Sequence, residues 1–128
     1  MAGDTIEQKP TRVSLIEHAG VSILLLDWTT LNLEQIKEMT AEARVVIHSA
    51  PPFSLLILSD FTDTHYDKAT ADLLSDYAKS NAPFVKASAL VGMTGMKKIL
   101  YNVAARVSGR TFSLHDTRES ALKWLVSQ

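Results

Sequence analysis

The sequence predicts a single α/β domain whose mainly parallel sheet has about five strands, in the order β-β-α-β-α-β-α-β-α. Short, almost continuously apolar segments alternate with segments whose apolar residues recur at helical spacing, which is typical of parallel strands joined by helices. The first two apolar segments, residues 12–17 and 21–26, are joined by a short Gly-containing link. We therefore expect a hairpin that adds one antiparallel strand at the N-terminal edge.

After the hairpin we expect a helix, a central strand and a second helix. Asn32 is the predicted N-cap of the first helix and Gln35 completes a capping box, and an apolar stripe over residues 33–47 follows. Two consecutive prolines end this helix. Residues 54–58 are apolar on both faces, as a central parallel strand requires. Residues 66–80 have a further helical pattern, which ends before an Asn-Ala-Pro sequence.

The C-terminal half alternates in the same way. Residues 84–91 are expected to form a strand, residues 96–107 a helix with one apolar face, and residues 111–114 a short strand. Asp116, with Glu119 three residues later, is the expected start of the last helix. The segments expected at the centre of the sheet are Ile23–Leu26, Leu55–Leu58 and Ala87–Val91.

Length and composition limit the classes of function. The 128 residues, 46% of them hydrophobic, suffice for one domain, which we place at residues 12–127 after a flexible arm over residues 1–11. The absence of cysteine excludes disulfides, thiolate metal sites and cysteine nucleophiles. The net charge of −1 argues against a nucleic-acid partner. No transmembrane segment or signal peptide is expected, so the predicted location is cytoplasmic.

Ligand sites in open α/β sheets lie beyond the carboxyl ends of the strands, and four segments are expected to share that rim. These are Asp27-Trp28-Thr29, Asp60-Phe61-Thr62, Gly92-Met93-Thr94-Gly95 and His115-Asp116. The three aspartates could supply oxygen ligands to Mg²⁺. The alternative, which we favour, is that they end strands and cap helices, and we predict no metal site.

The Gly92–Gly95 turn precedes a predicted helix and two lysines. Free N–H groups at a helix N-terminus can bind an anion, although the spacing of a nucleotide-binding loop is incomplete and no cofactor is expected. The alternative is a tight turn without a ligand. If a ligand binds at this rim, the candidate residues are Gly92, Thr94, Gly95, Lys97, Asp60, Thr62 and Trp28.

The sequence contains no arrangement that predicts catalysis. The four histidines are scattered, and only His115 falls at the expected rim, without a nucleophile identified beside it. The Gly-x-Ser-x-Gly pattern of serine hydrolases is absent. We therefore expect a protein that is not an enzyme.

Charge is unevenly distributed along the chain. Residues 1–76 have 12 acids and 5 bases, a net charge of −7, whereas residues 77–115 have six bases and no acid. Such asymmetry favours a docking face, with self-association as a homodimer as its simplest form. Burial of the apolar side chains in the core, and a monomer, is the alternative. One stripe of the predicted helix suffices to cover the sheet, so the docking face would leave Met93 and Tyr101 partly exposed. The candidate interface residues are Met93, Met96, Lys98 and Tyr101.

Two segments carry a resemblance to a known family. Ala89-Leu90-Val91-Gly92 precedes a helix, and residues 112–125 contain a strand Phe, an acid, an Ala-Leu pair and a Trp-Leu pair. With the element order, these resemble the SpoIIAA-like branch of the STAS fold (sulphate transporter and anti-sigma-factor antagonist domains) over residues 12–127. The resemblance implies a STAS-like domain, and the similarity of this branch to Sec14-type lipid-binding domains implies a small apolar ligand as an alternative.

STAS antagonists switch partners through phosphorylation of a serine in an Asp-Ser-[Ser/Thr]-Gly loop. The nearest match here is Asp67-Lys68-Ala69-Thr70, in which Lys and Ala replace the hydroxyl residues and the Gly is missing. Thr62 and Thr64 are nearby but out of register. We therefore expect a non-catalytic, regulatory protein-interaction module without the phospho-switch. The alternative is a lipid- or anion-binding domain with its site at the carboxyl ends of the strands.

Overall fold

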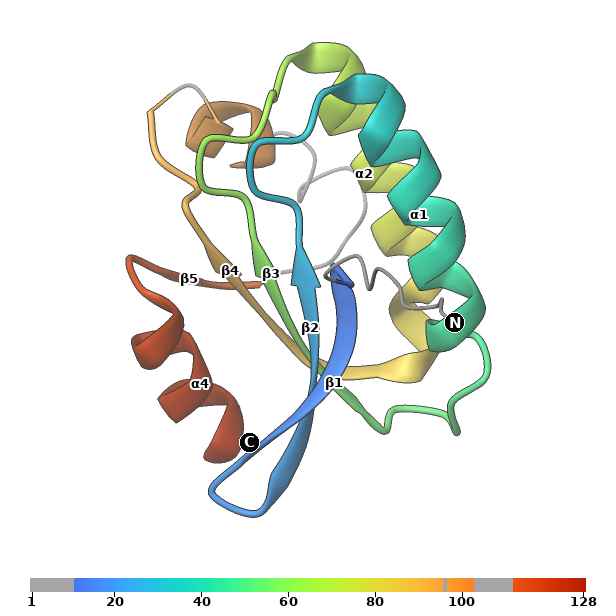
Figure 1. The fold of residues 1–128 in the computed structure, drawn as a ribbon, viewed down its shortest axis with the longest axis vertical. Coiled ribbons are helices and arrows are strands. Elements are labelled where there is room, and N and C mark those ends of the chain that lie inside the picture. Colours follow the sequence, from blue (N-terminus) through green and yellow to red (C-terminus); the bar gives the residue numbers. More distant parts are fainter. Residues whose placement is uncertain (1–10, 96, 103–111) are drawn as a thin grey trace, which may run out of the picture.

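A computed structural model describes residues 11–95, 97–102 and 112–128. Its five-stranded sheet has the order β1-β2-β3-β4-β5, in which β1 and β2 are antiparallel and all other neighbours are parallel (Figure 1). The strands are β1 (Val13–His18), β2 (Val21–Asp27), β3 (Leu55–Asp60), β4 (Val85–Val91) and β5 (Ser113–His115). The predicted fold class and the three predicted central strands are thus confirmed.

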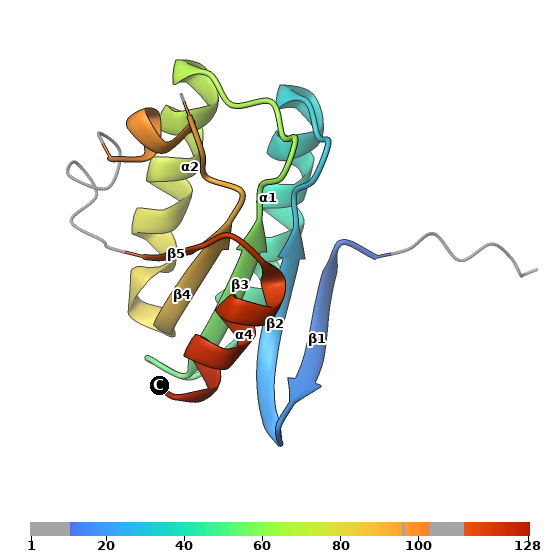
Figure 2. The same cartoon turned by 90° about the vertical axis from the view of Figure 1, so that its left-hand side faces the viewer.

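Helices cover both faces of this sheet. They are α1 (Leu33–Ile47), α2 (Lys68–Asn81), the 3₁₀ turn η2 (Ala82–Phe84) and α4 (Arg118–Val126), and residues 97–102 are also helical. α1 and α2 lie on one face and α4 on the other (Figure 2). Leu24 and Leu26 of β2 pack in the core under α1 and α2, whereas Ile23 packs with Leu125 of α4. None of the described helices is long and apolar enough to cross a membrane.

The parallel register aligns the carboxyl ends of four strands. Asp27 of β2 is opposite Asp60 of β3, Asp60 is opposite Val91 of β4, and Val91 is opposite His115 of β5. The predicted sharing of one rim is therefore confirmed for the strand ends.

Two helix starts differ from the sequence prediction. α2 begins at Lys68 because the side chain of Asp67 accepts a hydrogen bond from the N–H of Thr70, so Tyr66 lies before the helix. α4 begins at Arg118, and its N-cap is Thr117 rather than the predicted Asp116. Asp116 and Thr117, the two residues that follow β5, both have side chains that can cap a helix, and the sequence pattern alone does not choose between them.

Other element boundaries agree more closely. The capping box of Asn32 and Gln35 at the start of α1 is confirmed in both directions. β4 starts one residue later than predicted, because Pro83 and its neighbours form η2. β5 is shifted toward the C-terminus, to Ser113–His115. Most of the predicted arm over residues 1–11 and the second half of the predicted helix over residues 96–107 lie outside the described residues.

Candidate functional site

Two loops with the same sequence pattern follow β2 and β3. In Asp27-Trp28-Thr29, the Asp27 carboxylate accepts hydrogen bonds from the N–H of Thr29 (3.0 Å) and from its hydroxyl (2.6 Å). In Asp60-Phe61-Thr62, the Asp60 carboxylate accepts the equivalent bonds from Thr62, at 3.0 Å and 2.7 Å. The repeat is visible in the sequence as Asp-aromatic-Thr after two adjacent strands, but it was not among the predicted features.

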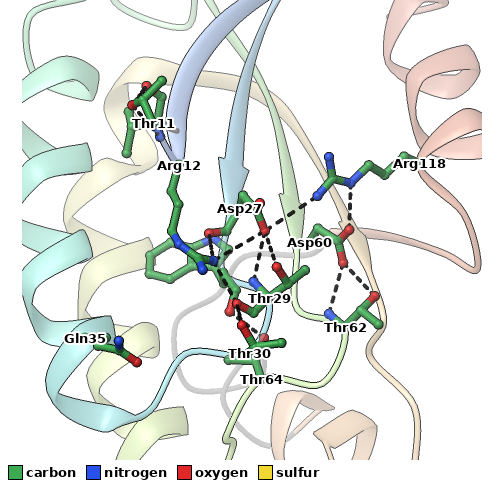
Figure 3. Close-up of polar contacts among 12 residues, drawn as sticks. Thr11, Arg12, Asp27, Thr29, Thr30, Gln35, Asp60, Thr62, Thr64 and Arg118 are labelled. Atoms are coloured by element: carbon green, nitrogen blue, oxygen red, sulfur yellow. Dashed lines mark hydrogen bonds and ion pairs between the residues drawn. The ribbon is translucent and has the colours of Figure 1, made fainter. Parts of the chain in front are cut away.

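Arg118 connects the two loops to α4 (Figure 3). Its Nε donates to Oδ2 of Asp60 at 2.7 Å, and its Nη2 lies 3.5 Å from Oδ1 of Asp27. Arg12 approaches Asp27 from the other side, with 3.7 Å between Nη1 and Oδ1, and donates to the carbonyl of Thr29. The two aspartates are thus paired with arginines, and the described residues contain no group of three His, Cys, Asp or Glu placed to hold a metal.

Asp60 is the buried member of this network. Burial by itself raises the pKa of a carboxyl group, but hydrogen bonds from Thr62 and Arg118 outweigh it and lower the pKa of Asp60 below 3.8. The carboxylate is therefore ionised at neutral pH and ties the start of α4 to the sheet rim.

The Gly92–Gly95 turn packs directly against the second of these loops. Gly92 has φ +84°, and a Cβ atom there would lie 2.6 Å from the backbone nitrogen of Thr62. Lys97 donates from Nζ to the carbonyl of Phe61 at 2.8 Å. Thr94 and Gly95 are exposed. These contacts hold the turn and the following helix against the loop that follows β3, which is a structural role. Anion binding at this turn remains a prediction.

A cavity of about 70 Å³ lies below the rim, between the sheet and α2. Strands β2, β3 and β4 supply Leu26, Ile57 and Leu90 to its wall. Of the seven candidate ligand-binding residues, only Trp28 lines it, and the other six lie outside its lining: Asp60, Thr62, Gly92, Thr94, Gly95 and Lys97. The remaining described lining residues are Ser59, Phe61, Tyr66, Leu74, Ser75, Tyr77, Ala78, Asn81, Ser88, Met93, Tyr101 and Phe112.

The aromatic residues of the two repeated loops form one side of the cavity wall. The rings of Trp28 and Phe61 stack with centroids 5.3 Å apart, Tyr77 contacts the Trp28 ring edge-on at 5.7 Å, and Tyr66 contacts the Phe61 ring edge-on at 5.9 Å. Burial, with a smaller effect of Tyr101, raises the pKa of Tyr66 to about 12. The wall is therefore an apolar environment in which Tyr66 stays protonated.

The indole nitrogen of Trp28, in this wall, has no hydrogen-bond partner among the described residues. Trp28 is fully buried, and its Nε1 makes no hydrogen bond within the described parts of the chain. A buried indole N–H normally has an acceptor. The sequence placed Trp28 at the rim, but its burial and its unpaired donor follow from packing between the sheet and α2.

Two of the predicted interface residues are not on the surface. Met93 and Tyr101 are only 5% and 8% exposed, so the prediction that they remain partly outside the core is wrong. Both line the cavity, and the hydroxyl of Tyr101 accepts a hydrogen bond from the N–H of Phe112 at 3.0 Å. Lys98 is exposed as an interface residue must be, and Met96 lies outside the described residues.

His115 connects β5 to α4. One ring nitrogen lies 2.8 Å from the hydroxyl of Ser113 and the other 2.7 Å from that of Ser120. Because both nitrogens are already hydrogen-bonded within the fold, the arrangement accounts for the histidine as a structural link.

The threonines near the expected STAS switch position are also engaged in the fold. The Thr64 hydroxyl is buried and donates to the carbonyl of Trp28 at 2.7 Å, and the buried Thr70 hydroxyl donates to Asp67 at 2.9 Å. With the bond from Thr62 to Asp60, each of the three hydroxyls holds a loop or a helix start.

A solved structure has the same architecture. An uncharacterised protein of the DUF3478 family from Shewanella loihica PV-4, described as having a SpoIIAA-like fold, superposes with a TM-score of 0.64 at 16% sequence identity. The match covers 88% of this chain and 91% of that chain. No family model and no curated protein matches the sequence. At this identity the likeness shows the fold alone, and this chain has the SpoIIAA-like fold that its sequence resembles.

Proposed function

We propose that the chain is a non-catalytic binding domain that holds a small, largely apolar molecule in the cavity between the sheet and α2. One observation carries the proposal: an apolar cavity of about 70 Å³ is lined by Trp28, whose buried indole N–H has no partner in the part of the chain that the structure describes. Ligand sites of this type combine apolar walls with a few polar groups that orient the ligand. The SpoIIAA-like fold is compatible with this function but does not specify it.

The size of the cavity limits the ligand. A single water needs roughly 10–15 Å³ of such volume, so about 70 Å³ corresponds to about five water positions. An apolar cavity of roughly 150 Å³ binds benzene, so a single ring with a short substituent fits here only if side chains of the lining move outward. A long acyl chain would need more space, so we favour a small ring compound over a membrane lipid.

The chemistry of the lining supports binding without turnover. Its described residues include no Asp, Glu, His, Lys or Arg. The titratable side chains of the described lining are therefore those of three tyrosines, Tyr66, Tyr77 and Tyr101. The pKa of about 12 keeps Tyr66 protonated. The rim carboxylates Asp27 and Asp60 are paired with arginines rather than turned to a substrate.

A protein-interaction module of the STAS type, without the serine switch, is the second candidate. It is favoured by large apolar side chains on the surface: Val45 near the end of α1 is 71% exposed and Phe53 in the following loop is 67% exposed. Sedimentation at micromolar concentration tests self-association, and Val45→Asp and Phe53→Asp should abolish a dimer that uses this surface. A substitution of Met93, one of the interface residues that the sequence predicted, would not test this surface because Met93 is buried.

A matched pair of substitutions on α2 tests the proposed cavity. Ala78→Leu adds volume at a lining position, whereas Ala69→Leu makes the same change on an exposed turn of the same helix. Single-ring probes such as toluene should raise the thermal midpoint of wild type and Ala69→Leu, since a ligand that binds the folded state stabilises it by about 2.7 kcal/mol at 100 times its Kd. Ala78→Leu should fold but gain no stability from the probe. Equal responses of both variants would contradict the proposal.

A further inference from the structure

We infer that the indole N–H of Trp28 selects the ligand, and that the ligand is a neutral, planar ring compound with a hydrogen-bond acceptor such as a carbonyl oxygen. This inference rests on the proposed binding function and specifies its chemistry. It derives from three features of the cavity: a fixed donor, aromatic walls and the absence of cationic side chains from the described lining.

The backbone on both sides of the indole is held by the second repeated loop. The N–H of Trp28 donates to the carbonyl of Asp60 at 3.0 Å, and the carbonyl of Trp28 accepts from the Thr64 hydroxyl at 2.7 Å. The ring itself is held between Phe61, stacked at an interplanar angle of 11°, and the edge-on ring of Tyr77. The indole of Trp28 is therefore held in one orientation, which reduces the entropic cost of binding.

The donor requires an acceptor from outside the described chain. Indole Nε1 can only donate, and no acceptor within the described residues lies in reach of it although the side chain is fully buried. Trp28 is among the residues that line the cavity, but its Nε1 has less than 1 Å² of accessible surface. An occupant of the cavity can therefore supply that acceptor once neighbouring side chains move aside.

The walls decide the rest of the ligand's chemistry. Stacked and edge-on aromatic contacts favour a flat molecule. No Lys, Arg or His side chain among the described lining residues is available to neutralise a carboxylate, and burying an unpaired charge is costly. A neutral carbonyl or ether oxygen therefore fits better than an anion.

The test uses two probes of nearly the same shape. Acetophenone carries a carbonyl oxygen where α-methylstyrene carries a CH₂ group. Wild type should bind acetophenone about fivefold to tenfold more tightly, the ratio expected for one net hydrogen bond. In ¹H–¹⁵N spectra of the Trp124→Phe variant, the remaining indole N–H signal, from Trp28, should move downfield with acetophenone and not with α-methylstyrene.

Trp28→Phe removes the donor and keeps an aromatic ring against Phe61. It should bind the two probes equally, while Trp124→Phe, a matched change on α4 outside the cavity lining, should keep the preference. If wild type binds both probes with equal affinity, the inference is overturned and the proposed function stands. If wild type binds neither probe, a cavity that holds only water is the conclusion and both are overturned. The Trp28 signal keeps the test decisive even where Trp28→Phe fails to fold.

Discussion

Gly92→Ala is the substitution whose effect the structure specifies most directly. Gly92 has φ +84°, a region that costs an L-residue about 1–2 kcal/mol. The added Cβ would lie 2.6 Å from the nitrogen and 2.8 Å from Cα of Thr62, both backbone atoms. That backbone cannot shift freely, because the N–H and the hydroxyl of Thr62 are both bound to the Asp60 carboxylate. Overpacking of this kind costs about 1–3 kcal/mol more.

The expected loss is therefore about 2–5 kcal/mol, a large part of the 5–15 kcal/mol by which domains of this size are typically stable. Gly95→Ala is the matched control, because its φ of +59° is also left-handed but nothing lies within 4 Å of the added Cβ. It should lose only the conformational part, about 1–2 kcal/mol. Urea unfolding followed by circular dichroism measures both. A Gly92→Ala variant no less stable than Gly95→Ala would refute the close approach to Thr62.

Three further predictions follow from the rim and the first helix. Arg118→Met should lower the free energy of unfolding by about 1–2 kcal/mol at neutral pH, because the half-exposed guanidinium pairs with buried Asp60. The folded-state pKa of Asp60 is below 3.8, so this contribution is complete above the unfolded-state pKa and is lost as the pH falls through the folded-state value. In urea unfolding, the difference in unfolding free energy between Arg118→Met and wild type should therefore narrow below about pH 4. A difference that does not change with pH would exclude Asp60 as the cause. Asn32→Ala should cost about 1 kcal/mol in the same assay, since it removes the cap of α1, and an unchanged stability would contradict that role. Phosphopeptide mapping of the native protein should find no stoichiometric phosphate on Thr62, Thr64 or Thr70, whose hydroxyls donate to Asp60, to a backbone carbonyl and to Asp67; phosphate on any of the three would contradict this prediction.

Local patterns in the sequence were sufficient for the sheet and for the first helix. The two-sided apolarity of Leu55–Leu58 predicts a central strand, and β3 is central in the sheet. Asn32 with Gln35 predicts a capping box that the structure confirms. Signals of this type lie within a few consecutive residues, so they need no knowledge of the remaining chain.

Predictions that depended on neighbours distant in sequence were wrong or only partly right. Met93 and Tyr101 were expected to be partly exposed, because one stripe of a helix suffices to cover a sheet, but both line the cavity under the rim. Asp27 and Asp60 were expected to end strands and to cap helices. Both do end strands, but neither caps one of the described helices. Their partners are the threonines of the two repeated loops, Arg12 just before β1, and Arg118 of α4.

The sequence by itself determined the order of the elements, the central strands and the meeting of the strand ends at one rim, because apolar periodicity and capping chemistry act over a few residues and parallel strands share a direction. Only the tertiary structure decided which side chains leave space between the sheet and α2, and that the indole of Trp28 is buried there with no acceptor from residues 11–95, 97–102 or 112–128. The physical reason is that a cavity is the space that packed side chains leave unfilled. Its size and its unpaired donor depend on the volumes and rotamers of side chains from three strands, α2 and the connecting loops together, so no single segment encodes them.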